Sequence, residues 1–302
     1  MKSPLPPTGI RGAERLVFIL GHPLEHSLSP LMHNAAFRAL RMPWAYAPLD
    51  ILKDQVGSAV EILRSSNVHG ANVTVPYKED VLPYLDKVEK EAAWLGSVNT
   101  IYRRGERLWG TSTDGEGFLR SLGPWRKKLR GSRGLLVGAG GAAKAVAEAL
   151  ARSGARGIFI ANRSSSRAQQ LVRLLLKRHR GLKAGAVSLR EGEKLMGGCD
   201  WVIQSTSLGL KTGDPSPLSL AGAQRTTLAV DLIYNRSTTF LKDARRIHLP
   251  SMGGLGMLLH QGALSFEYWT GRKAPLEMMR SVLLRRLVSS SPNQRMGLPD
   301  NR

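Results

Sequence analysis

The sequence predicts an α/β protein of two domains, and three observations support this prediction. With 302 residues, the chain is long enough for two domains of common size. Apolar and β-branched runs alternate with helical patterns over the first 114 residues. The alternation then restarts near residue 115 with a glycine-rich strand–turn–helix pattern. Because strands separated by helices form parallel βαβ units, we expect a parallel-rich sheet in each domain.

The first domain is expected to span residues 1–114. Its segment RLVFILG is apolar enough for a buried strand, and the following SPLMHNAAFRAL has the spacing of a helix. Ser29 is the expected N-cap of that helix, with Pro30 at its first position, where a missing N–H does no harm. The expected strands are residues 15–21, 44–51 and 69–76, and the expected helices are residues 29–40 and 54–66.

The second domain is expected to span residues 115–249. After a basic helical stretch, it offers four apolar runs with the character of strands: GLLVG, GIFIA, DWVIQSTS and TLAVDLIY. The chain turns helical again from about residue 255 to residue 288. Its polar end, residues 289–302, is expected to be a flexible tail.

The net charge of +21 is concentrated in the second part of the chain. Residues 1–114 hold 13 Lys and Arg against 12 Asp and Glu, whereas residues 115–302 hold 31 against 11. A positive field of this kind attracts nucleic acid, membrane phosphates or a phosphate-bearing cofactor. The alternative is that the basic residues form only a solvated surface. The basic residues lack interleaved aromatics, and no helix-turn-helix or zinc-finger spacing is present. We therefore expect no nucleic-acid partner.

Other features of the composition narrow the setting. No apolar run approaches the roughly 18 residues of a membrane span, and the N-terminal residues lack the apolar centre of a secretory signal, so no membrane partner is expected. The single cysteine, Cys199, excludes an internal disulfide and favours a reducing, cytoplasmic setting. His22, His26 and His33 lie close in sequence, but prolines interrupt any helix that would align them, so no metal site is expected.

The glycine-rich turn predicts a dinucleotide site. Segment GLLVGAGGAAKAV places an apolar strand before a G-x-G-x-x-A pattern and an alanine-rich helix after it. The glycines permit a tight turn, and the helix N-terminus offers unpaired N–H groups to a pyrophosphate. The alternative is a βα turn that binds nothing. The expected cofactor contacts in this Rossmann-like domain are Gly138, Ala139, Gly140, Gly141 and Ala142.

The end of the next strand favours NADP over NAD. NAD-binding chains place an acid there, which accepts a hydrogen bond from the ribose 2′-OH. Here the segment NRSSSR offers guanidinium groups instead, which pair with a phosphate dianion that an acid would repel. The alternative is that both arginines lie in solvent. The expected contacts of the 2′-phosphate are Asn162, Arg163, Ser164 and Arg167.

Polar side chains also gather at the expected strand ends of the first domain. In an open parallel sheet, ligands bind beyond the carboxyl ends of the strands, so we expect these side chains to converge. Any one of them alone is more simply explained as a cap or turn residue. Lys78 follows Pro76 and is expected in the first turn of a helix. The group consists of Ser27, Ser29, Asn72, Thr74, Lys78, Asn99 and Asp114.

These motifs together make the chain similar to the shikimate dehydrogenase family. The resemblance covers roughly residues 15–280. It runs in family order through GHPLEHSLSPLMHN, NVTVPYKED, GSVNT, GTSTDGEGF, GAGGAAKAV, ANRSSSRA, STSLGL, DLIY and GGLGMLLHQGALSFEYWTG. Only the glycine turn among these is shared widely with other dehydrogenases, so the combination is specific.

The resemblance implies a reversible, NADPH-dependent reduction of 3-dehydroshikimate to shikimate in aromatic amino acid biosynthesis. It implies that Lys78 acts as general acid and base together with Asp114. The substrate-binding residues that it implies are Ser27, Ser29, Thr74, Asn99, Tyr234 and Gln261. The residues that it implies beside the nicotinamide are Leu232, Gly254 and Met257. It also implies that helices within residues 250–288 complete the substrate domain.

Two residues depart from the family pattern near the cofactor motifs. Gln204 takes the place of an asparagine and Arg236 that of a proline. Neither touches the proposed proton-transfer pair, so activity is expected and any effect should fall on cofactor affinity. The alternatives are a quinate/shikimate dehydrogenase with broader polyol and NAD use, and a basic nucleic-acid-binding protein on a relict fold. We expect a small-molecule substrate and a monomer or homodimer.

Overall fold

The computed structural model describes residues 14–290, and the chain divides into two compact units. The first unit comprises Met1–Thr111 and Ser265–Leu283, and the second comprises Ser112–Leu264 and Leu284–Arg302. Each unit is built on one six-stranded sheet. From residue 291 onward, the predicted tail lies outside the described residues.

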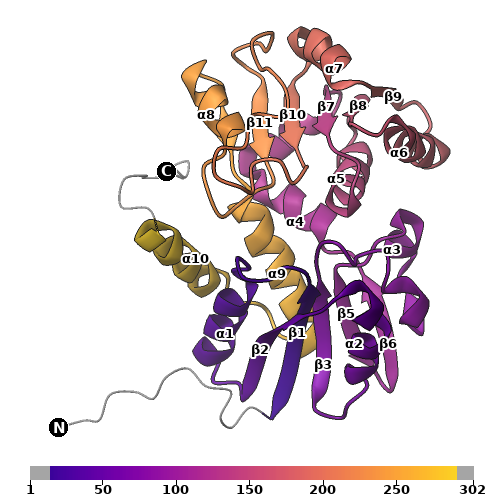
Figure 1. The fold of residues 1–302 in the computed structure, drawn as a ribbon, viewed down its shortest axis with the longest axis vertical. Coiled ribbons are helices and arrows are strands. Elements are labelled where there is room, and N and C mark those ends of the chain that lie inside the picture. Colours follow the sequence, from indigo (N-terminus) through magenta and orange to yellow (C-terminus); the bar gives the residue numbers. More distant parts are fainter. Residues whose placement is uncertain (1–13, 291–302) are drawn as a thin grey trace. The chain divides into compact units, whose positions relative to one another are not determined.

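The sheet of the first unit mixes parallel and antiparallel strands. Its strands are β1 (Arg15–Gly21), β2 (Trp44–Asp50), β3 (Val68–Val73), β4 (Lys87–Val88), β5 (Thr100–Arg104) and β6 (Arg107–Thr111). They lie in the order β2-β1-β3-β5-β6-β4 (Figure 1). β1 pairs in parallel with β2 and β3, as the strand–helix alternation predicted. The three predicted strands are confirmed as β1, β2 and β3.

The hairpin of β5 and β6 is a feature that the alternation did not predict. β5 pairs antiparallel with β3 on one side and with β6 on the other. Arg104 pairs with Arg107, so the connecting loop has only two residues, Gly105 and Glu106. Gly105 has a φ of 65°, a left-handed conformation that two-residue hairpin loops require and that glycine adopts easily.

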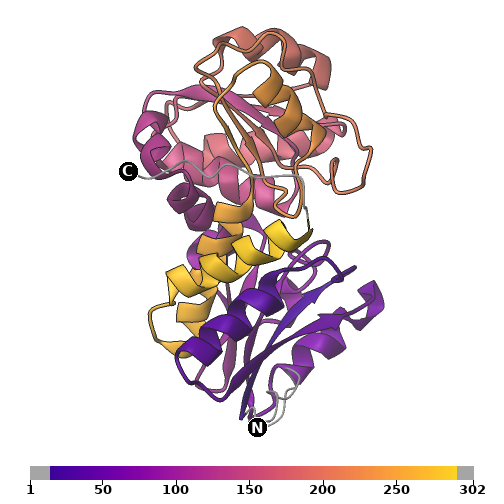
Figure 2. The same ribbon diagram turned by 90° about the vertical axis from the view of Figure 1, so that its left-hand side faces the viewer.

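Helices cover both faces of this sheet. They are α1 (Ser29–Ala39), α2 (Val56–Ile62), α3 (Lys90–Leu95), the end of α9 (Leu255–Thr270) and the first part of α10 (Leu276–Ser290). Alternate residues of β3 face α2 and α9: Ala71 shares a buried core with Val60 of α2, whereas Asn72 Nδ2 donates to Ser265 Oγ of α9 at 3.0 Å. α1 and α2 accordingly lie on opposite faces (Figure 2).

Two local predictions in this unit were wrong. The N-cap position of α1 is Leu28, which already has helical angles, so Ser29 lies inside the helix and no side chain caps it. Lys78 lies in a series of turns and not in a helix. The amide of Val81 still bonds to the carbonyl of Tyr77, but that of Leu82 bonds to Glu79, and the following proline has no N–H to continue a helix.

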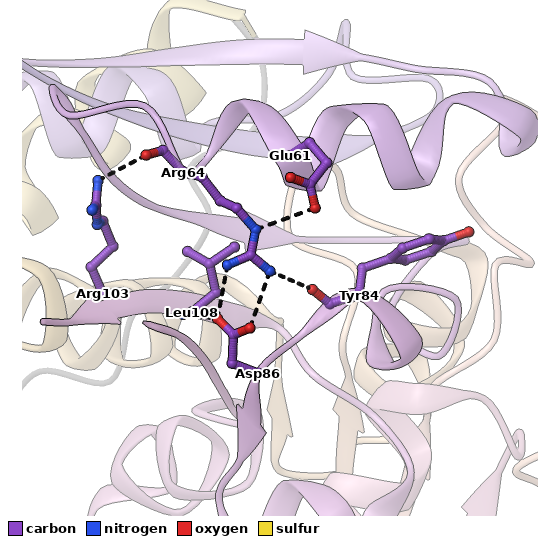
Figure 3. A network of polar contacts seen from close by, with 6 residues as sticks. All are labelled: Glu61, Arg64, Tyr84, Asp86, Arg103 and Leu108. Atoms are coloured by element: carbon purple, nitrogen blue, oxygen red, sulfur yellow. Dashed lines mark hydrogen bonds and ion pairs between the residues drawn. The ribbon is translucent and has the colours of Figure 1, made fainter. Parts of the chain in front are cut away.

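An arginine network fastens the end of α2 to the edge of the sheet (Figure 3). Arg64 donates to both carboxylate oxygens of Asp86, from Nη1 at 2.9 Å and Nη2 at 3.2 Å. Asp86 also accepts from the backbone N–H of Leu108 at 2.7 Å. The hydrogen bond with Arg64 is the main cause that holds the pKa of Asp86 below its usual value. The carboxylate therefore joins the residue before β4 both to α2 and to β6.

The second unit has an entirely parallel sheet. Its strands are β7 (Arg133–Val137), β8 (Gly157–Ala161), β9 (Lys183–Val187), β10 (Trp201–Gln204), β11 (Leu228–Asp231) and β12 (Ser251–Met252). Their order is β12-β11-β10-β7-β8-β9, so the direction of winding reverses between β7 and β10. This is the doubly wound order of a dinucleotide-binding fold, and it confirms the predicted Rossmann-like domain.

Helices connect the parallel strands of the second unit (Figure 1). They are α5 (Gly141–Arg152), α6 (Ser165–Arg178), α7 (Leu189–Leu195) and α8 (Thr239–Arg246), whereas α4 (Asp114–Ser121) precedes β7 and packs on α5. Four consecutive residues are buried at the end of β7 and all four residues of β10 and of β11 are buried, because a parallel sheet is covered on both faces. This burial on both faces explains why these strands are continuous apolar runs in the sequence.

Candidate active site

The glycine turn of the second unit has the geometry of a phosphate-binding loop. Gly138 follows β7 with a φ of 114°, a backbone conformation that other residues rarely adopt. Gly140 is extended and occupies the N-cap position of α5, so the free N–H groups of the helix begin here. A Cβ built at Gly140 would meet no atom within 4 Å, which leaves the backbone open to a ligand. The residues present therefore fit a pyrophosphate.

The segment after β8 presents its arginines to solvent. Asn162 Nδ2 donates to the carbonyl of Ser164 at 2.9 Å, and Ser164 occupies the N-cap position of α6. Arg163 and Arg167 are exposed. The turn is thus held by Asn162 and leaves both guanidinium groups accessible at a helix N-terminus, where an anion is stabilised.

Two of the residues predicted beside the nicotinamide, Leu232 and Gly254, meet just after the end of β11. Leu232 donates its N–H to the carbonyl of Gln204 at 2.9 Å. Gly254 donates to the carbonyl of Ile233 at 3.1 Å, and a side chain at Gly254 would collide with the carbonyl oxygen of Leu232. The close approach of the two segments therefore requires glycine at this position. Met257, the third predicted residue, lies in the first turn of α9 and is buried.

A buried carboxylate supports this junction. Asp231, the last residue of β11, is wholly buried. It accepts hydrogen bonds from the N–H of Ile233 at 2.9 Å and from the hydroxyl of Thr238 at 2.6 Å. Burial raises the pKa of Asp231 to about 6, although both hydrogen bonds act in the opposite direction. Asp231 thereby fixes the turn that carries Leu232.

In the first unit, backbone bonds bring two predicted substrate-binding residues and the predicted catalytic lysine into one region. Thr74 follows β3 and donates its N–H to the carbonyl of Leu20 in β1 at 2.8 Å. Asn99 is 3% exposed, and its backbone carbonyl accepts a hydrogen bond from the N–H of Val73 at 2.8 Å. The carbonyl of Lys78 accepts from the N–H of Val98 at 2.8 Å. The loop that carries Lys78 is therefore tied next to Asn99.

Ser27 and Ser29 lie at the start of α1 in the same unit. The hydroxyl of Ser27 accepts from the N–H of Ser29 at 3.4 Å. Ser29 is buried and Ser27 is half-buried. Asn72, which also stood among the predicted polar residues, points instead into the core: its amide donates to the carbonyl of Asn99 at 3.1 Å and to Ser265.

The remaining predicted residues belong to the second unit. Asp114 is the first residue of α4 and is 5% exposed. One turn further along α4, a side chain at Gly117 would contact the backbone and Cβ of Gln261, so α4 and α9 approach closely at this level. Gln261 Nε2 donates to the carbonyl of Leu258 at 3.0 Å. Tyr234 is half-buried in the loop after β11.

Ser205, which lies in the STSLGL motif, was not among the predicted site residues. Its hydroxyl donates to the carbonyl of Val137 at 2.6 Å and lies 2.5 Å from where a Cβ of Gly138 would be. The available signal was a polar residue directly after a buried parallel strand, which is the same signal that identified the other sites. Arg236, one of the two departures, donates from Nη2 to the hydroxyl of Thr212 at 2.9 Å and so links the loops after β10 and β11.

Residues 14–290 were compared with two further kinds of site, a metal centre and a membrane-spanning helix, and they form neither. No group of three or more His, Cys, Asp or Glu side chains in this range is arranged to hold a metal ion. No helix within it is long and apolar enough to cross a membrane.

Comparison with known proteins identifies relatives for nearly the whole chain. Family models match at residues 19–101 (shikimate dehydrogenase substrate binding domain), 124–236 (shikimate/quinate 5-dehydrogenase) and 254–284 (shikimate 5′-dehydrogenase C-terminal domain). The shikimate dehydrogenase (NADP(+)) of Desulforamulus reducens is 42% identical over 284 residues, which cover 91% of this chain and 96% of that protein.

Solved structures give the same picture. A shikimate dehydrogenase crystallised with NADP+ superposes with a TM-score of 0.83 at 32% identity, over 90% of this chain and 96% of that one. The enzyme of Thermus thermophilus, crystallised with NADP(H) and shikimate, gives a TM-score of 0.79 at 36% identity, over 90% and 99% of the chains. The chain described here belongs to the shikimate dehydrogenase family, whose NADP-dependent members are oxidoreductases.

Proposed function

We propose that the chain catalyses the reversible NADPH-dependent reduction of 3-dehydroshikimate to shikimate, with Lys78 and Asp114 as the proton-transfer pair. The observation that carries the proposal is that the chain has both a glycine turn suited to a dinucleotide and a lysine among polar side chains at strand ends. The second unit has a glycine turn open at Gly140. The first has a lysine tied by its backbone beside Asn99.

The chemistry demands a proton donor. NADPH, when bound, would supply hydride to the carbonyl carbon, so negative charge would develop on the carbonyl oxygen. In this proposal the Lys78 ammonium lies within hydrogen-bond reach, donates the proton and stabilises the developing charge. Asp114 orients the ammonium and accepts a hydrogen bond from a substrate hydroxyl. In the reverse direction, the neutral amine of Lys78 removes the same proton.

We further propose that uncharged side chains select the substrate. Ser27, Ser29, Thr74, Asn99, Tyr234 and Gln261 offer hydroxyl, amide and phenol groups, which suit a polyol acid. A site built from such groups rejects an analogue that lacks a hydroxyl, because a polar group would then be left unpaired. The first unit is proposed as the main substrate-binding part and the second as the NADP-binding part.

The cofactor residues are proposed in the same way. Gly138, Ala139, Gly140, Gly141 and Ala142 would hold the pyrophosphate; Asn162, Arg163, Ser164 and Arg167 would hold the 2′-phosphate; and Leu232, Gly254 and Met257 would lie beside the nicotinamide. The exposure of Arg163 and Arg167 at the start of α6 supports this. We also propose a monomer or homodimer in the cytoplasm, the compartment that a single cysteine favours.

The test combines activity and one substitution. The wild-type chain should reduce NADP with shikimate and use NADP and shikimate in preference to NAD and quinate. Lys78→Ala should lower kcat by roughly 10²- to 10⁴-fold with KM within a few-fold, because the amine acts mainly in the transition state. Lys90→Ala, at an exposed lysine of the same unit, is the control and should retain activity. An unchanged kcat for Lys78→Ala would refute the role of this lysine.

A further inference from the structure

The last side chain of β10, Gln204, is wholly buried and is bonded to the backbone of the loop that follows it. Its Oε1 accepts from the N–H of Thr206 at 2.6 Å. Its Nε2 donates to the carbonyl of Leu208 at 2.7 Å and, more weakly, to that of Thr206 at 3.4 Å. The loop offers one donor and two acceptors, and a carboxamide is the side-chain group that matches all three.

The loop held by Gln204 lies against the glycine turn. Ser205 donates both its N–H, at 2.8 Å, and its hydroxyl, at 2.6 Å, to the carbonyl of Val137 at the end of β7. Its hydroxyl, together with Thr206, fills the space where a side chain at Gly138 would be. Ser205 and Thr206, at the start of this loop, therefore pack directly on the first residue of the turn.

This contact lies where the winding of the sheet reverses. β7 and β10 are neighbouring parallel strands, and the strand order runs in opposite directions from them. In doubly wound sheets, dinucleotides bind beyond the carboxyl ends of the strands at this switch point. The loop after β10 and the glycine turn after β7 thus flank the place that general principles assign to the cofactor.

We propose that Gln204 is a positioning residue for NADP: it holds residues 205–208 in the shape that keeps the glycine turn ready to bind the cofactor. Gln204 touches no reacting atom. Its contribution is preorganisation, since a loop that is already ordered loses less conformational freedom when the ligand binds. The inference rests on the NADP site of the proposed function and adds to it a residue that supports that site.

Two substitutions of equal length test this role. Gln204→Glu keeps an acceptor for Thr206 but turns oxygen lone pairs toward the carbonyls of Leu208 and Thr206. Gln204→Met fills the same space without hydrogen bonds. The matched control is Gln224→Met, because Gln224 also donates from Nε2 to a backbone carbonyl, that of Gly197 at 2.6 Å. Gly197 lies in the short 3-10 helix before β10 (Met196–Gly198) and not in the loop after it.

The measurement is the dissociation constant of NADPH, obtained by fluorescence titration without shikimate, together with kcat at saturating NADP. Both Gln204 variants should bind NADPH about tenfold more weakly, the effect of about one lost hydrogen bond, while kcat at saturation stays within about threefold. Gln224→Met should bind NADPH as the wild type does. If Gln204 had only a structural role, Tm would fall in all three variants, and NADPH affinity would not fall separately from kcat.

Unchanged NADPH affinity in folded Gln204→Glu and Gln204→Met would overturn the inference, as would a loss confined to kcat. If either variant does not fold, Ser205→Ala tests the same contact, and NADPH binding equal to that of the wild type would overturn the inference too. Failure of the wild type to oxidise shikimate would contradict the proposed function only. The NADPH titration would still decide the role of Gln204.

Discussion

At the scale of single residues, His33 is a buried histidine without a hydrogen-bond partner. Its ring is 0% exposed, and neither ring nitrogen finds a donor or acceptor within residues 14–290. It stacks on Tyr46 with 4.6 Å between ring centroids and meets the edge of Trp269 at 5.1 Å. Burial lowers the pKa of His33 to about 3. The folded chain therefore excludes a proton that the unfolded chain binds.

The consequence is that His33 makes the folded chain less stable in acid, whereas the raised pKa of Asp231 acts in the opposite direction between about pH 6 and pH 3.8. The unfolded histidine takes up its proton as the pH falls through about 6.5, whereas the folded one does so only near pH 3, so stability is lost between these values. This amounts to about 1.4 kcal/mol per pH unit, or about 2 kcal/mol by pH 5. His33→Leu should remove that part of the slope. Urea unfolding followed by tryptophan fluorescence at pH 8, 6 and 5 measures it.

At pH 7 the same substitution should change stability by less than about 1 kcal/mol, because the lost ring stacking and the removal of two unbonded nitrogens act in opposite directions. A wild-type slope that persists in His33→Leu would show that another group causes the acid sensitivity.

The sequence identified candidate site residues well where a motif fixed the backbone. Gly138 has the positive φ that the glycine pattern predicted, and Gly140 stands at the start of α5. Ser205 was not identified, because its contact with Gly138 joins two strands that are far apart along the chain. Which side chains meet across neighbouring strands depends on strand order, and that order is not written in local periodicity.

At the scale of elements, the carboxylate of Asp86 is the joint between α2, β4 and β6 (Figure 3). Asp86→Asn keeps one acceptor but loses the charge-assisted pair with Arg64. We expect the free energy of unfolding to fall by about 1 kcal/mol, since these side chains are only about two-thirds buried and solvent weakens the pair. Urea unfolding at pH 7 measures the change.

The control for this joint is Glu61→Gln, which removes the more exposed partner of Arg64, at 62% exposure. It should cost less than about 0.5 kcal/mol. Equal losses in the two variants would mean that the pair of Arg64 with Asp86 contributes no more than its exposed pair with Glu61.

Elements with a strong pattern were predicted, and elements with a weak one were not. β1, β7 and β10 are buried runs whose apolar residues are contiguous, so the sequence identifies them directly. β5 ends in Arg104 and β6 begins at Arg107, and both arginines are exposed. These two strands therefore lack a contiguous buried apolar run. The helix expected at Lys78 was wrong because tertiary bonds, such as that between the Lys78 carbonyl and Val98, hold the segment in turns.

At the scale of the whole molecule, the restart of the alternation near residue 115 predicted two parts, and the chain does form two units with separate cores. The pattern did not predict that Ser265–Leu283 belongs with the first unit; the family resemblance implied a return of this kind. The structural reason is packing over long range. Trp269 Nε1 donates to the carbonyl of Ile101 at 2.9 Å, across a separation of 168 residues. No local window of sequence contains such a pair.

Two units with separate cores should respond separately to the two ligands, and amide hydrogen exchange tests this. NADPH alone should slow exchange in the second unit at residues 138–144 and 162–167. Shikimate alone should slow it in the first unit around residues 72–78 and 97–100. At a ligand concentration of about 100 Kd, a bound segment gains about 2.7 kcal/mol, which slows exchange roughly 100-fold.

NADH should protect residues 162–167 less, because it offers Arg163 and Arg167 no 2′-phosphate. The hairpin tip at Gly105 serves as the internal control and should exchange at the same rate in every case. Protection by shikimate confined to the glycine turn would contradict the assignment of Thr74, Lys78 and Asn99 to the substrate.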